Sequence, residues 1–210
     1  MTPHSDIAAV SEALANRSEQ RAVVVTDSVF SADGDLAPLR ELHDVCRRHG
    51  ALMVVDEAHG LGVRGTGGRG LLHEVGLAGE PDVVMTVTLS KALGSQGGAV
   101  LGPAAVRDHL IDAARPFIFD TGLAPAAVGS ARAALQVLVD EPRRAQRVLD
   151  RAAELAAAAA CLQRGVRVGC FRPPTVPAGT SRLRLTARAS LSEDDMTLAR
   201  EVLTDVLSPS

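Results

Sequence analysis

The sequence predicts an α/β fold with a parallel, doubly wound sheet, followed by a small C-terminal α/β domain. Short runs of consecutive apolar, mostly β-branched residues recur in the first half of the chain, with stretches of helical apolar spacing between them. Runs without polar alternation are typical of strands that are buried on both faces. Beyond residue 140 the strand-like segments alternate instead. We therefore expect two domains, residues 1–140 and 141–210.

The individual elements follow from the same patterns. Strands are predicted at residues 21–27, 51–56, 82–88 and 97–102. Helices are predicted at residues 37–50, 104–114 and 124–139, and an Ala-rich helix at 141–165 begins near Pro142 and ends at Gly165. The second domain continues with half-exposed strands at 166–171 and 181–187 and a capped amphipathic helix at 192–207.

Composition excludes several classes of protein. The balance of 22 basic and 25 acidic residues leaves a formal charge of −3, and aromatic residues make up 2% of the chain, so a nucleic-acid partner is not expected. The three cysteines show no CxxC spacing, which favours reduced thiols over disulfides or a metal site. Without a signal peptide or an 18-residue apolar stretch, no membrane association is expected, and we expect a cytoplasmic protein.

The chain has a single lysine, Lys91, among its 22 basic residues. Arginine replaces lysine readily on an exposed surface, but it stays protonated and cannot act as a neutral amine nucleophile. A lysine retained in so arginine-rich a chain therefore indicates chemistry that arginine cannot perform. Survival by chance is the alternative, and the neighbours of Lys91 must decide between them.

Polar residues follow the predicted strands. Ligands of parallel α/β sheets bind beyond the carboxyl ends of the strands, and one rim would collect Asp27, Ser31, Asp56, His59, Thr88 and Lys91. The five other histidines have no partners at metal-ligand spacing, and we expect no metal site.

Two nucleotide-binding interpretations fail on context. The segment VVDEAHG (54–60) is similar to the acidic box of an ATPase, but no GxxxxGK[ST] phosphate loop precedes it. The segment GTGGRG (65–70) has GxGxxG spacing, yet it begins nine residues after a strand and opens no clear helix. We expect it to be a mobile loop near the site.

A pyridoxal phosphate site fits the rim better. Such a site needs a lysine for covalent attachment of the cofactor, a carboxylate for the pyridine nitrogen, a donor to the phenolic oxygen, and phosphate contacts. Asp56 and His59 can supply the carboxylate and the donor from one turn, with Glu57 as a spacer, and Lys91 has Thr88 and Ser90 beside it. Each residue taken alone has an ordinary structural interpretation. Together with the single lysine, however, they favour a functional site.

Four segments in order, TDSVFSADGDLAPL (26–39), VVDEAHGLGVRGTGGRG (54–70), TVTLSKALGSQGGAVLG (86–102) and FRPPTVPAGTSRLRLT (171–186), resemble the α-oxoamine synthases, and most closely their biotin-synthesis branch. These are fold-type I pyridoxal phosphate enzymes with an aminotransferase-like fold. The resemblance implies a decarboxylative condensation of L-alanine with pimeloyl-CoA or pimeloyl-carrier protein. Use of glycine or serine, as in related members, remains an alternative.

The resemblance also implies residue roles. Lys91 would hold the cofactor and move the α-proton, Asp56 would pair with the pyridine nitrogen, and His59 and Ser31 would lie near the phenolic oxygen. Thr88 would bind the phosphate, and Thr121 would reach the phosphate of a neighbouring subunit, which implies a homodimer with shared sites. The amino acid carboxylate would be held by Arg184, with Arg172 and Thr175 nearby.

The chain departs from this family in length. The N-terminal part of the large domain, which would supply a ring-stacking histidine, a glycine-rich phosphate loop and acyl-CoA contacts, has no counterpart, and a segment near residue 165 is also shortened. We therefore keep two hypotheses: an enzyme, or the lysine-bearing part of one, and a non-catalytic remnant.

Overall fold

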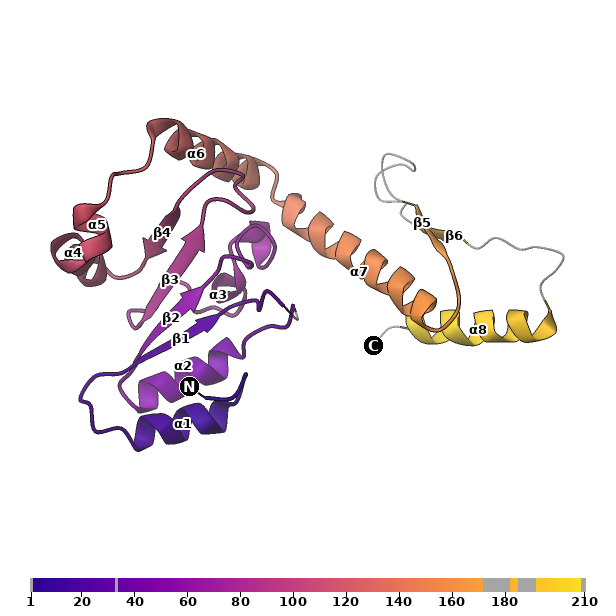
Figure 1. Cartoon of the computed structure of the whole chain (residues 1–210), viewed down its shortest axis with the longest axis horizontal. Helices are drawn as coiled ribbons and strands as arrows, with labels where there is room; N and C mark the ends of the chain where they lie inside the picture. The colour runs from indigo at the N-terminus through magenta and orange to yellow at the C-terminus, as the bar shows by residue number, and fades with distance from the viewer. Residues whose placement is uncertain (1, 33, 172–181, 185–191, 209–210) are drawn as a thin grey trace. The chain divides into compact units, whose positions relative to one another are not determined.

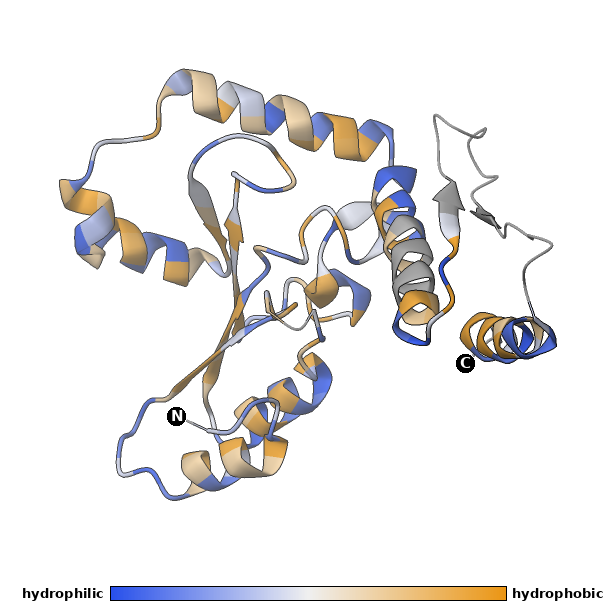
Figure 2. Cartoon of the chain, turned by 45° about the vertical axis from the view of Figure 1, so that its right-hand side comes forward, coloured by the Kyte–Doolittle hydropathy of each residue, from blue (hydrophilic) through white to orange (hydrophobic). Residues whose placement is uncertain are grey.

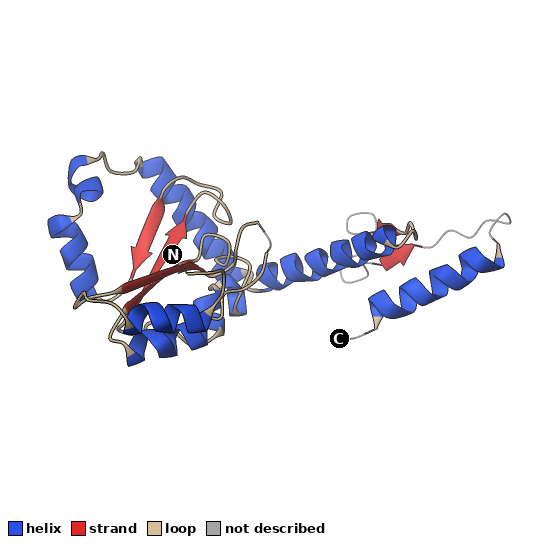
Figure 3. Cartoon of the chain, turned by 60° about the horizontal axis from the view of Figure 1, so that its bottom comes forward, coloured by secondary structure: helices blue, strands red, loops and turns tan. Residues whose placement is uncertain are grey.

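The computed structural model describes residues 2–32, 34–171, 182–184 and 192–208. The chain divides into two compact units, Met1–Gln146 and Arg147–Ser210. Figure 1 follows the chain from the N-terminus, through a sheet with flanking helices, into a helical second unit, and Figure 3 separates helices from strands. Because the placement of the units is not fixed, each is described by itself.

The first unit contains the four predicted strands in one sheet, in the order β1-β2-β3-β4. Strands β1 (Val23–Asp27), β2 (Leu52–Asp56) and β3 (Val83–Thr88) are parallel. The prediction was wrong for the fourth strand, since β4 (Gly98–Leu101) runs antiparallel to β3. Only a short turn separates these two strands, and a parallel connection needs a crossover of a dozen or more residues.

Burial of every strand on both faces was also wrongly predicted. All four residues of β4 are exposed, and the side chain of Val25 in β1 is 70% exposed. Within the described residues β1 and β4 each pair with one strand only, so they are the edges of this sheet. Edge strands leave backbone hydrogen-bonding groups without strand partners.

One face of the sheet is covered by helices α1 (Ile7–Ala15) and α2 (Leu39–Arg48), which Figure 1 shows together below the strands. Helix α1, which was not predicted, begins where the carboxylate of Asp6 accepts the backbone N–H of Ala9 at 2.9 Å. Met53 and Val55 from β2 are completely buried against Val45 and Cys46 of α2. Burial raises the pKa of the Cys46 thiol to about 11, so this cysteine is protonated and unreactive at neutral pH.

Short elements connect β2 to β3 and follow β4. After β2 come a 3₁₀ turn (Thr66–Gly68) and α3 (Leu71–Glu74), neither of which was predicted. Helices α4 (Ala104–Ala113), α5 (Arg115–Phe119) and α6 (Pro125–Asp140) follow β4. The segment 65–70, expected to be mobile, is tied by the backbone N–H of Gly70 to the carbonyl of Arg64 at 2.8 Å and by that of Gly62 to the carbonyl of Gly68 at 2.7 Å.

The second unit is helical with a two-stranded ribbon. Helix α7 (Arg143–Gln163) leads into it, β5 (Gly169–Phe171) pairs antiparallel with β6 (Arg182–Arg184), and α8 (Glu193–Leu207) follows. Ser192 and Asp195 form a capping box at the start of α8, as the sequence predicted a capped helix. Polar and apolar residues lie on different sides of α8 (Figure 2), and its Val202 is completely buried. None of the helices that are described is long and apolar enough to span a membrane.

A polar cluster joins α2 to the amino end of β3. The Nε2 atom of His43, a buried residue, lies 3.0 Å from the carboxylate of Asp82, and the guanidinium of Arg47 is 3.7 Å from the same side chain. Glu80 completes a set of possible metal ligands here, but the positive charge of Arg47, 3.9 Å from Glu80, opposes a cation. Burial alone would raise the pKa of Asp82, yet the hydrogen bond from His43 and the nearby positive charges lower it overall.

We predict that Asp82→Asn lowers the free energy of unfolding at pH 7 by about 1–3 kcal/mol, because His43 loses a charged partner. A carboxyl whose pKa is lower in the folded state contributes stability above its unfolded pKa and loses it as the pH falls through the folded value. The difference between the two proteins should therefore disappear in strong acid, as measured by urea unfolding across pH. Asp44→Asn, at an exposed position of α2 next to His43, is the control and should have little effect. An equal loss of stability in both variants would contradict a stabilising contact between Asp82 and His43.

Candidate active site

The predicted rim exists because β1, β2 and β3 end at neighbouring positions. Asp27, the last residue of β1, pairs in register with Asp56, the last residue of β2, and Asp56 pairs with Thr86 of β3. The residues that follow each strand therefore leave the sheet at one edge. This is the edge at which parallel α/β sheets commonly bind ligands.

The turn after β2 holds Asp56 and His59 in a fixed relation. The backbone N–H of Ala58 donates to Oδ1 of Asp56 at 2.7 Å, and those of Gly60 and Leu61 donate to the carbonyl of Glu57 at 3.1 and 2.9 Å. These bonds close a tight turn directly after the strand. Both Asp56 and His59 remain partly exposed, so their side chains are accessible at the rim.

The turn after β3 carries Lys91. Its base is closed by the backbone N–H of Leu89, which donates to the carbonyl of Gly97 at 2.9 Å, and Gly94, at a φ of 57°, donates to the carbonyl of Lys91 at 3.0 Å. At the strand end the hydroxyls of Thr88 and Ser90 lie 2.7 Å apart. The turn therefore presents an exposed amine beside two hydroxyl groups.

The two turns meet. The amine nitrogen of Lys91 lies 2.7 Å from Nε2 of His59, which is hydrogen-bonding distance. The two turns also approach each other closely at Gly62 and Ala92, since a Cβ on Gly62 would lie only 2.5 Å from Cβ of Ala92. Asp56, His59 and Lys91 are thus brought to one rim by two neighbouring strands, which is what the sequence predicted for their positions. An amine, an imidazole and a carboxyl so arranged can hold a carbonyl cofactor and transfer protons.

Glu57 does more than the spacing expected of it. Its side chain is completely buried, and its two carboxyl oxygens accept the hydroxyl of Ser28 at 2.7 Å and the backbone N–H of Leu72 at 2.6 Å. Sequence reasoning missed both Glu57 and Ser28 as a pair. The glycines at positions 60 and 70 were the sequence feature that could have indicated a buried side chain here, because a Cβ at either position would overlap the Glu57 carboxyl group.

The remaining predicted site residues lie outside the two turns. Ser31 is exposed in the segment after β1, and Thr121 is exposed between α5 and α6. Within the described part of the chain, neither makes a hydrogen bond to the residues of the two turns. Arg184 is in β6, opposite Gly169, in the second unit, and its side chain is not described. Arg172 and Thr175 lie outside the described residues.

A protein family and several individual proteins are similar in sequence to this chain. The family model for aminotransferase class I and II matches residues 2–160. The 8-amino-7-oxononanoate synthase of Mycolicibacterium gilvum (strain PYR-GCK) is 76% identical over 234 aligned residues, which cover 99% of this chain and 62% of the relative. The enzyme of that name from Mycolicibacterium vanbaalenii is also 76% identical, with coverage of 100% and 62%. The chain thus spans less than two thirds of the length of these curated relatives.

A solved structure is similar as well. Serine palmitoyltransferase from S. paucimobilis, with a bound PLP–myriocin aldimine, superposes with a TM-score of 0.67 at 27% identity, covering 97% of this chain and 59% of the other.

The alignment with the M. gilvum relative is longer than the chain itself, 234 positions against 210, so at least 234 − 210 = 24 positions have no counterpart here.

We predict that Gly62→Ala destabilises the first unit more than Gly79→Ala. Both glycines have positive φ, 81° and 93°, so both substitutions carry a left-handed backbone cost of about 1–2 kcal/mol. Only at Gly62 would the new Cβ also overlap a neighbour, Ala92, which adds roughly 1–3 kcal/mol, whereas nothing lies within 4 Å of a Cβ at Gly79. Urea unfolding of the two variants measures the difference, and equal losses would argue against the close approach of the two turns.

Proposed function

Because the chain belongs to the aminotransferase class I and II family, we propose that it binds pyridoxal phosphate through Lys91 and carries the lysine-bearing part of an 8-amino-7-oxononanoate synthase. The reaction is the condensation of L-alanine with pimeloyl-CoA, or a pimeloyl-carrier protein, with loss of CO₂ and release of the thiol carrier. The observation that carries the proposal is the 2.7 Å contact between Lys91 and His59 at the rim where Asp56 ends β2.

The residues of this rim fit the cofactor. An exposed amine is available for covalent attachment, and a partly exposed carboxyl and imidazole lie on the turn beside it. The hydroxyl of Thr88, 2.7 Å from that of Ser90, offers a polar contact for the phosphate. Once bound, pyridoxal phosphate supplies an electron sink for a carbanion at the substrate α-carbon.

The side chains of this chain would then perform three tasks. Asp56 pairs with the protonated pyridine nitrogen and keeps it charged while negative charge develops. Lys91 takes a proton from the α-carbon of the amino acid and returns one to that carbon after the new carbon–carbon bond has formed and CO₂ has left. His59 holds the amine of Lys91 and, with Ser31, donates toward the phenolic oxygen.

The choice of alanine rests on the relatives. Proteins named 8-amino-7-oxononanoate synthase are 76% identical to this chain, whereas serine palmitoyltransferase is 27% identical. The higher identity favours alanine and a pimeloyl thioester over a glycine- or serine-using reaction. We assign the grip on the amino acid carboxylate to Arg184, with Arg172 and Thr175 beside it. A non-catalytic remnant is the competing hypothesis, and the lysine experiment below distinguishes the two.

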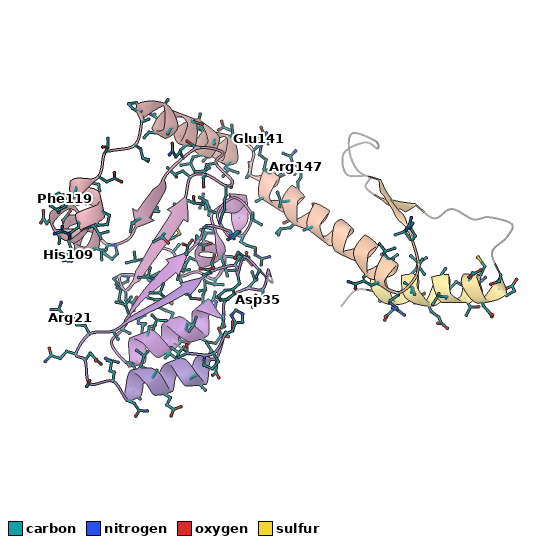
Figure 4. The ribbon with its side chains drawn as sticks, viewed as in Figure 1. Arg21, Asp35, His109, Phe119, Glu141 and Arg147 are labelled. Atoms are coloured by element: carbon teal, nitrogen blue, oxygen red, sulfur yellow. The ribbon has the colours of Figure 1, made fainter. Side chains whose placement is uncertain are left out.

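We further propose that two copies of the chain pair and share their sites, with Thr121 reaching the cofactor phosphate of the neighbouring subunit. The exposed apolar side chains around Thr121 support a subunit contact here. Phe119, two residues before it, is 73% exposed, and Phe117 and Leu123 are 65% and 42% exposed. Figure 4 labels Phe119 on the outer side of α5. Large exposed apolar side chains in such a group are typical of protein interfaces.

The proposal predicts that the purified chain mixed with pyridoxal phosphate gives a visible absorbance band and that borohydride fixes the cofactor to the peptide containing Lys91. Lys91→Arg should abolish both signals, because arginine keeps a positive charge but offers no neutral amine. Circular dichroism of this variant is the control for folding. If neither the chain alone nor the chain supplemented with the remaining part of a relative gives the band, the remnant hypothesis is the better one.

Asp56→Ala should separate binding from turnover. The covalent attachment through Lys91 should persist, whereas product formation in the complemented enzyme should fall by about 10²–10³, the usual scale for loss of a preorganised electrostatic contact. Absorbance measures the first quantity and release of free thiol measures the second. A variant with near-normal turnover would remove Asp56 from the proposed role.

A further inference from the structure

Glu57 is an unusual residue to find inside this unit. It is completely buried, and no salt bridge of the described residues involves it. Burying a carboxyl group is costly unless its oxygens are hydrogen-bonded, and an apolar side chain of similar volume would fill the space more cheaply. A buried carboxyl group with no cation partner therefore indicates a requirement for its specific hydrogen bonds.

Those hydrogen bonds join three separate segments. Oε2 accepts the hydroxyl of Ser28, which directly follows β1, and Oε1 accepts the backbone N–H of Leu72 near the start of α3. The backbone N–H of Glu57 itself donates to the carbonyl of Thr86 in β3 at 2.8 Å. Ser28 is in turn fixed to the sheet, since its backbone N–H donates to the carbonyl of Asp56 at 2.8 Å.

The packing around the carboxyl group is equally specific. A Cβ on Gly60 would lie 1.8 Å from Oε2, and a Cβ on Gly70 would lie 2.8 Å from Oε1. Gly60 does not have a positive φ, so its backbone conformation would accept alanine. The three atoms nearest to the added Cβ all belong to the Glu57 and Ser28 side chains, which indicates that the turn between Asp56 and Gly60 is shaped around this carboxyl group.

We propose that Glu57 is a positioning residue for the active site. It lies between Asp56 and His59, and it anchors their turn to β1 and α3 so that His59 stays at hydrogen-bonding distance from Lys91. The inference deepens the proposed function and depends on it for its catalytic meaning. Its structural content, the coupling of Glu57 to the Lys91–His59 contact, can be tested without any cofactor.

The test uses the single lysine. The cofactor-free full chain is labelled with limiting acetic anhydride at a series of pH values, and acetylation of the Lys91 peptide is measured by mass spectrometry against the N-terminal amine as internal reference. Glu57→Ala should produce the same fold-change and the same shift of the pH profile as His59→Ala. Glu57→Gln should stay close to the wild type, because its amide oxygen can accept the Leu72 N–H while its NH₂ group donates to Ser28.

Met53→Ala is the matched control. Met53 is also completely buried, in β2, the strand that Glu57 directly follows, and it belongs to the apolar core with Val45 and Cys46 of α2. This variant should lower the unfolding midpoint and leave the Lys91 profile unchanged. A folded Glu57→Ala with the wild-type profile overturns the proposal, and so does an equal shift in Met53→Ala. Should Glu57→Ala not fold, Ser28→Ala takes its place, and a wild-type profile there is equally decisive.

A second measurement addresses the packing. Gly60→Ala should lower the unfolding midpoint in the wild-type background but much less in the Glu57→Ala background, where the obstructing carboxyl group is gone. Additive losses would contradict the arrangement. Because neither experiment uses pyridoxal phosphate, a chain that fails to bind the cofactor refutes the proposed function alone, whereas an unchanged Lys91 profile refutes the role of Glu57 alone.

Discussion

Parallel hydrogen bonding between β2 and β3 is the constraint on which the site depends. It sets Asp56 opposite Thr86, so the two turns that follow these strands leave the sheet side by side. Small residues then allow the turns to touch. Gly62 approaches Ala92 so closely that a Cβ on Gly62 would overlap the Cβ of Ala92. His59 and Lys91, which are 32 positions apart in the sequence, are thereby brought to hydrogen-bonding distance. Neither side chain could be placed by its own local structure.

The sheet that carries these turns has one well-covered face. Helices α1 and α2 bury Met53 and Val55, whereas Val25 in β1 and all of β4 remain exposed. The rim is therefore built on the best-packed part of the described chain, at the ends of the two central strands. Ser31 and Thr121, the outer residues of the proposed site, are both exposed. This difference in burial fits the proposed roles, in which the central residues hold the reacting atoms and the peripheral residues contact a phosphate or a partner subunit.

The strands and long helices could be predicted because apolar periodicity reports directly on burial. The antiparallel direction of β4 is contained in the length of its connection and not in the segment GGAVLG itself, because the eight residues between the predicted strands are too few for a parallel crossover. Helix α1 is short and rich in alanine, and the 3₁₀ turn and α3 lie in a glycine-rich stretch, so neither gives a clear period. At the site, Asp56, His59 and Lys91 followed from strand ends. The partner of Glu57, Ser28, lies 29 residues away, and no local pattern predicts that contact.

The exposed position of Lys91 has a practical consequence for handling the protein. A protease specific for lysine would have a single cleavage point in the whole chain, the peptide bond between Lys91 and Ala92, and both residues are exposed. The cut would leave β1, β2 and β3 on one fragment and β4 on the other. Anything that covers the amine, whether a small molecule or a second protein, would be recorded as protection of that one bond on a gel.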